Sequence, residues 1–115
     1  MTDHATRTRH RAIHLPCILA AGYHFFRGNT CELSEEEAAV QIPSLAYPGV
    51  KSPAHGVAAV LTLGLGRGGG AMREILKIPC KVTYIATTVV GLQLYTQDLD
   101  ERQQKIFDAV LKVKV

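Results

Sequence analysis

The chain has 115 residues, of which 47% are hydrophobic and 20% are charged. This is the composition of an ordinary globular protein, so it excludes a disordered or low-complexity chain. The length suits one domain with one hydrophobic core. The net charge of +3 is too small to predict nucleic-acid binding by itself.

The first ten residues are expected to form a flexible basic arm ahead of a single globular domain over residues 11–115. They show no apolar periodicity. Arg7, Arg9 and Arg11 occupy every second position at the end of this segment and directly after it. An extended arm would therefore project three guanidinium groups to one side, as contacts with phosphates require. No aromatic residue lies among them, so base stacking is not supported. A solvated tail is the simpler interpretation.

The next part of the chain predicts two strand regions. Residues 11–20 are apolar and suit a first strand, with Pro16 at an edge position or a bulge. Residues 23–33 suit a short hairpin that turns at Gly28-Asn29, because these two residue types tolerate positive φ.

A short helix is expected over residues 34–42. Ser34 can cap its first turn while Glu37, three residues later, reaches back to the Ser34 amide. The acids at its start also complement the helix dipole. Pro43 ends the helix because the residue before a proline avoids the helical conformation, and a loop follows over residues 43–53.

Beyond this loop, residues 57–65 fit either a helix or a strand, and Gly64 and Gly66 favour the strand. Residues 71–78 are left open between strand and short helix. Residues 81–95 alternate apolar and polar positions with many β-branched residues, which predicts one strand of unusual length.

The chain closes with an amphipathic helix expected over residues 98–111, capped by Asp98. Together these elements predict an α+β fold. Its core would be a mostly antiparallel sheet or small barrel, accompanied by the short helix at 34–42 and the C-terminal helix.

A glycine-rich segment offers the one candidate ligand loop. Gly64, Gly66 and Gly69 satisfy G-x-G-x-x-G after a predicted strand, and Arg67 lies among them. Glycine backbones can approach a phosphate closely. The nucleotide-binding motif also needs a following helix and an acid about twenty residues later, and neither is evident. A flexible loop is the competing interpretation.

No catalytic constellation emerges. None of the three serines lies in G-x-S-x-G. His14-x-x-Cys17 is half of a zinc site, but His24 and Cys31 lack a standard spacing for the other half. The sequence therefore predicts no catalytic residue, no metal site and no cofactor, and favours a non-enzymatic protein over an enzyme.

Three widely spaced cysteines without a Cys-x-x-Cys pair indicate free thiols in a reducing compartment. No signal peptide is readable, and the apolar stretches 57–65 and 82–94 are too short to span a bilayer. We therefore expect a soluble protein without a membrane partner. It would not be secreted and would lie in the cytoplasm or in a virion.

Residues 23–41 combine an aromatic stretch with Phe26-Arg27-Gly28, and then Glu32-Leu33-Ser34 leads into an acidic, alanine-containing segment. This arrangement resembles a segment of small phage-encoded structural proteins. The resemblance implies a virion or tail component and transfers no functional residue.

The leading functional prediction is a non-enzymatic structural or assembly subunit of a homo-oligomer or larger particle, such as a virion or tail component. The long strand, the arm and the loops would make the contacts of self-association. One alternative is a small anionic-ligand-binding protein or enzyme that uses the Gly64–Gly70 loop. The other is nucleic-acid contact through Arg7, Arg9 and Arg11.

Overall fold

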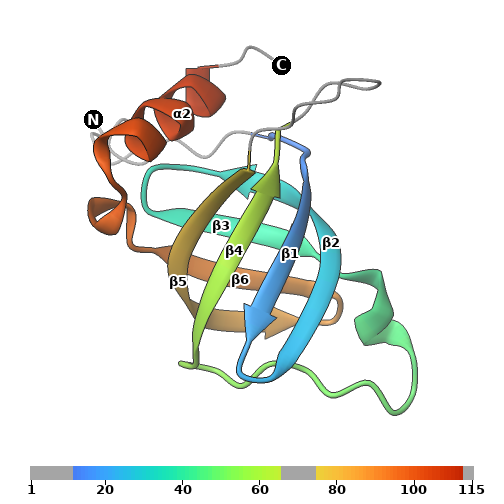
Figure 1. Cartoon of the computed structure of the whole chain (residues 1–115). Helices are drawn as coiled ribbons and strands as arrows, with labels where there is room; N and C mark the ends of the chain where they lie inside the picture. The colour runs from blue at the N-terminus through green and yellow to red at the C-terminus, as the bar shows by residue number, and fades with distance from the viewer. Residues whose placement is uncertain (1–11, 66–74, 113–115) are drawn as a thin grey trace, which may run out of the picture.

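The structure, a computed structural model, describes residues 12–65 and 75–112. Figure 1 shows its strands wrapped into a barrel, with the helical segments outside them. The strands are β1 (Pro16–Ala21), β2 (His24–Leu33), β3 (Glu37–Gln41), β4 (Ala58–Gly64), β5 (Ile75–Ala86) and β6 (Val89–Leu94). The helical segments are the 3-10 turns η1 (Pro43–Ala46) and η2 (Thr96–Asp98) and the α-helix α2 (Glu101–Lys112).

The six strands form a closed barrel in the order β1-β2-β3-β6-β5-β4, and every neighbouring pair is antiparallel. Alternate side chains of each strand point inward and build one core. This confirms the expected small antiparallel barrel with a C-terminal helix. The largest fully buried side chains of the described residues are Phe107, Leu19, Leu33, Ile42, Leu61, Leu63, Leu76, Ile78, Leu92, Val40, Val82 and Val90.

The predicted hairpin turn at Gly28-Asn29 is wrong, because β2 runs unbroken through both residues. The chain turns earlier, at Gly22, which adopts a φ of +64° between β1 and β2. Gly28 serves a different purpose in the barrel. A Cβ atom placed there would lie 2.1 Å from the carbonyl oxygen of Gln41, so the close approach of two strands requires glycine at this position.

The short helix expected at 34–42 is also wrong, because Glu37–Gln41 is strand β3. Ser34 does act as a cap, since its Oγ accepts hydrogen bonds from the backbone nitrogens of Glu36 and Glu37 at 3.3 and 3.0 Å. The capped turn leads into a strand. Ala38 and Val40 face the core, and β3 fills the place between β2 and β6, so tertiary pairing overrides the local helix signal.

The single long strand expected over 81–95 is instead a hairpin of β5 and β6. The chain reverses at Thr87 and Thr88, and Thr87 adopts a φ of 58°. The end of β3 holds this turn: the side-chain amide of Gln41 donates to Thr88 Oγ1 at 2.6 Å, and the Ile42 amide donates to the Thr88 carbonyl at 2.7 Å. Alternation continues on both sides of the turn, so the pattern alone does not reveal the reversal.

The two stretches of ambiguous type are strands where the structure describes them. Residues 58–64 form β4, as the glycines favoured. The second stretch becomes β5 from Ile75 onward, and residues 66–74 lie outside the described ranges.

The predicted C-terminal helix is present as α2, although its cap differs from the one expected. Asp98 lies in η2, and it is Asp100 Oδ1 that accepts the hydrogen bond from the Gln103 amide at 2.8 Å. Phe107 and Val110 are the buried residues of α2 and belong to the barrel core. The helix is therefore attached to the barrel by its apolar side.

Candidate functional site

Three strand termini meet at one end of the barrel, which we call the loop end. β1 begins there at Pro16, β4 ends there at Gly64, and β5 begins there at Ile75. β4 pairs with both β1 and β5, and Gly64 is directly opposite Ile75. The three termini are therefore neighbours across the sheet.

The loop end is where both predicted ligand-binding segments are attached. Gly64 is the last residue of β4, so the glycine-rich segment continues from this strand. The arm precedes residue 12 and hence leads into β1. The remaining predicted residues lie outside the described ranges: Gly66, Arg67, Gly69, Arg7, Arg9 and Arg11. In the sequence the two segments 1–11 and 66–74 carry five arginines and two acids.

The segment that follows the arm is fixed to β2 by one buried side chain. Thr30 is 1% exposed. Its Oγ1 accepts a hydrogen bond from the Leu15 amide at 2.8 Å and donates one to the Ile13 carbonyl. The Thr30 amide donates to the Leu15 carbonyl at 2.8 Å. The point at which the arm joins the barrel is therefore rigidly positioned, and Arg11 is only two residues from it.

A groove of about 340 Å³ opens on the outer surface beside the loop end. The described residues that line it include Pro16, Gly64 and Ile75, together with the apolar Ile18 and the cation Arg27. None of the lining residues within 12–65 and 75–112 is acidic. Its walls thus suit a planar apolar group with a negative charge near Arg27.

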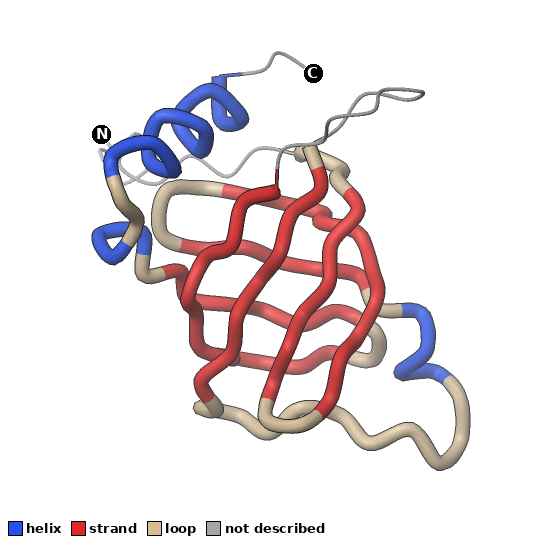
Figure 2. The backbone as a smooth tube through the Cα atoms, in the orientation of Figure 1, coloured by secondary structure: helices blue, strands red, loops and turns tan. Residues whose placement is uncertain are grey.

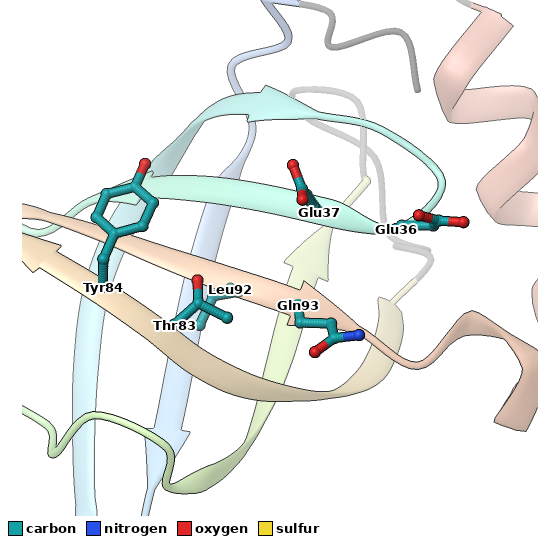
Figure 3. A pocket seen from close by; sticks show the side chains of 6 residues that line it. All are labelled: Glu36, Glu37, Thr83, Tyr84, Leu92 and Gln93. Carbon is teal, nitrogen blue, oxygen red and sulfur yellow. The ribbon is translucent and has the colours of Figure 1, made fainter. Parts of the chain in front are cut away.

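A second groove, of about 350 Å³, lies over β3, β6 and β5 and has the opposite charge. Figure 3 shows Glu36 and Glu37 along one of its sides, with Tyr84 and Gln93 nearby. Two carboxylates repel an anion. The groove beside the loop end is therefore the better site for an anionic ligand.

The free thiols do not form a reactive site. Burial, with a smaller contribution from the nearby charge of Cys31, raises the pKa of Cys17 to about 11. Burial also raises the pKa of Cys80 to about 12, with a hydrogen bond involving the Leu61 backbone acting in the opposite direction. The pKa of Cys31 is raised as well, by burial and by the charge of Glu32. All three stay protonated at neutral pH and are poor nucleophiles there.

The two buried thiols make the fold sensitive to alkali. In the folded chain they hold their protons up to pH 11–12, whereas in the unfolded chain they release them near pH 9. Raising the pH from 9 to 11 therefore favours unfolding, by up to about 1.4 kcal/mol per pH unit for each thiol. Urea unfolding across this range measures the effect. Lysines and tyrosines titrate in the same range, so the control is Cys17→Ala/Cys80→Ala, whose slope should be flatter. Equal slopes for both proteins would contradict the assignment.

Among residues 12–65 and 75–112, no group of three or more His, Cys, Asp or Glu side chains is arranged to hold a metal ion. The ring nitrogen Nδ1 of His14 lies 3.2 Å from the Thr30 carbonyl oxygen.

No helix in the described part of the chain is long and apolar enough to cross a membrane.

Two residues of the site were not anticipated from the sequence. Arg27 and Thr30 were both assigned to a turn, whereas β2 carries them with Arg27 facing outward and Thr30 inward. The available signal was the alternation of Phe26, Gly28 and Thr30 with Arg27 and Asn29. The turn propensity of Gly28-Asn29 concealed it.

Comparisons with known proteins identify the fold. No family model and no curated protein matches the sequence. The PilZ domain of CeSA from a cellulose-synthesizing bacterium is similar in structure, with a TM-score of 0.59 and 20% identity over 90% of this chain and 92% of that one. The Bacillus subtilis inhibitor of motility, MotI/DgrA, has a TM-score of 0.62 and 12% identity. Here the match covers 94% of this chain and 53% of that protein, so this chain spans about half of its length. The fold is that of a PilZ-like barrel.

These comparisons correct two expectations. The resemblance of residues 23–41 to phage structural proteins is wrong, because the structural neighbours are a PilZ domain and a motility inhibitor. The segment is two barrel strands joined by a capped turn. The prediction of a structural or assembly subunit of a homo-oligomer or larger particle, such as a virion or tail component, is wrong for the same reason. The long strand that motivated it is a hairpin within the barrel.

Proposed function

We propose that this chain is a regulatory domain that binds a small anionic ligand, a cyclic dinucleotide such as cyclic di-GMP, at the loop end. The similarity to a PilZ domain and to an inhibitor of motility suggests this class of ligand. The observation that carries the proposal is topological. The arginine-bearing arm and the glycine-rich loop are attached to neighbouring strands at one end of the barrel.

The chemistry of the site fits such a ligand. A cyclic dinucleotide has two phosphates and two flat bases. Guanidinium groups bind phosphate oxygens in pairs of hydrogen bonds, and Arg7, Arg9, Arg11 and Arg67 supply them in the two attached segments. The apolar groove bordered by Arg27 offers a surface for a base. The ligand would then lie across the arm, the loop and the outer surface of the barrel.

Calorimetric titration with cyclic di-GMP tests the proposal directly. We expect binding, together with a rise in melting temperature, because the ligand stabilises the folded state by mass action. A hydrogen bond to a charged group contributes about 1.5–3 kcal/mol. Arg7→Ala, Arg11→Ala and Arg67→Ala should therefore each weaken binding about tenfold or more.

The matched control is Lys51→Ala, which removes one exposed cation. Lys51 lies in the loop that leads to the start of β4, whereas the loop end contains the other terminus of this strand, Gly64. Its affinity should equal that of the unmodified chain. The absence of binding to cyclic di-GMP, GTP and inorganic phosphate alike would overturn the proposal. An equal loss in the Lys51 variant would show that net charge, rather than the loop end, is responsible.

Nucleic acid is the alternative partner of the arm. Three arginines that neutralise three phosphates of a duplex would give log affinity against log salt a slope of about −3. Deletion of residues 1–11 would remove this slope. A duplex that binds in this way, while cyclic di-GMP does not, would replace the dinucleotide proposal with nucleic-acid contact.

A further inference from the structure

One outer face of the barrel is apolar in its middle and cationic at its two sides. Its outward side chains form two rows across β2, β1, β4 and β5, set by the strand register. The first row is Arg27, Ile18, Thr62 and Lys77, and the second is Phe25, Ala20, Val60 and Pro79. We call these eight residues the β1–β4 face.

The β1–β4 face concentrates exposed apolar surface. Phe25 is 76% exposed, and Ile18 and Val60 are also among the exposed large hydrophobic residues. Ile75, 55% exposed, extends the face toward the loop end. Isolated exposed apolar residues are common, but a contiguous group on one sheet face is typical of an interaction surface.

We propose that the β1–β4 face binds an acidic amphipathic helix of a partner protein. The face shares Ile18, Arg27 and Thr62 with the groove beside the loop end. A helix and the proposed ligand would therefore compete there, and the helix is tested on the chain without added ligand. Charge supports the proposal: the face has Arg27 on β2 and Lys77 on β5, and none of its eight residues is acidic. Acids on both sides of a helix would meet these cations while its apolar stripe covers Ile18, Ala20 and Val60.

The dimensions of the face agree with a helix. Arg27 and Lys77 are three strand spacings apart, which is about 14 Å when measured along the curved sheet. A helix with its side chains is about 10–12 Å wide, so one lying along β1 and β4 has a cation on either side. Figure 2 shows strands crossing one another in front and behind, and their pairing closes them into one barrel. A closed barrel has no free strand edge for an added peptide strand, so a partner on this surface packs against side chains.

Two designed peptides test the proposal by NMR titration of the full chain. Both are 15-residue helices with a leucine stripe. One carries glutamate along both borders of the stripe and the other carries lysine. We expect the glutamate peptide to bind at least threefold more tightly, with amide shifts confined to β1, β4 and their neighbours. Arg27→Glu/Lys77→Glu should invert this preference.

Substitutions at two equally exposed valines, one in the face and one outside it, test the apolar part of the face. Val60→Asp should weaken binding of the glutamate peptide at least tenfold. Val50→Asp, at an equally exposed valine outside the face, should leave it unchanged, and the amide spectra show whether both variants fold. Equal affinities for the two peptides, shifts outside the face, or no effect of Val60→Asp would overturn the proposal. So would binding to phosphatidylglycerol vesicles but to neither peptide, which would make the face a membrane contact.

Discussion

Replacement of Phe107 by alanine is expected to lower the free energy of unfolding by about 3–5 kcal/mol, the usual cost of removing a buried phenylalanine. Phe107 is 1% exposed and is the largest fully buried side chain of the described residues. With Val110, it is one of the two buried residues by which α2 joins the barrel core. Urea unfolding followed by far-ultraviolet circular dichroism measures the loss.

The control for Phe107→Ala is Asp108→Ala on the same helix. Asp108 is exposed, and its carboxylate only accepts a hydrogen bond from Gln104 at 3.1 Å. Such surface changes are usually worth less than about 0.5 kcal/mol. A loss below about 1 kcal/mol for Phe107→Ala would contradict the interpretation that this side chain attaches the helix to the barrel.

The second large effect is expected at Gly28. Gly28→Ala would place a methyl group 2.1 Å from the Gln41 carbonyl oxygen and 3.2 Å from Ile42 Cγ1. The oxygen belongs to the backbone of β3, so relief requires β2 and β3 to move apart where they pair. We expect a loss of about 3 kcal/mol in the free energy of unfolding, at the upper end of the cost of overpacking.

Gly91→Ala is the matched comparison for Gly28→Ala. Its added Cβ would lie 2.0 Å from the ring of Tyr84, so the steric overlap is as severe as at Gly28. Tyr84 is half exposed, so its ring can swing into solvent, and the loss should stay below about 1 kcal/mol. Equal losses at Gly28 and Gly91 in urea unfolding would show that the overlap alone, and not the immobility of the backbone, determines the cost.

The sequence by itself determined the elements whose signals are local. Alternation and glycines indicated a strand within residues 57–65, and the amphipathic period indicated the C-terminal helix. Both are present as β4 and α2. The capping role of Ser34 is local as well, since its Oγ accepts a hydrogen bond from the Glu37 amide. The Ser34 amide donates to the backbone carbonyl of Glu37 and not, as expected, to its side chain. The sequence also indicated the arginines of the arm and the glycines after β4 as candidate ligand-binding residues.

Only the tertiary structure decided how these pieces pair and meet. Residues 37–41 carry a helix signal but form a strand, because β2 and β6 provide hydrogen-bond partners on both sides. The end of β3 stabilises the reversal at Thr87 and Thr88. The hydrogen bond from Gln41 to Thr88 joins residues that are 47 positions apart in the sequence. Side-chain alternation specifies which face a residue occupies and not which strand lies beside it. For that reason the sequence could not reveal that the arm and the loop, more than fifty residues apart, are attached to one end of a closed barrel.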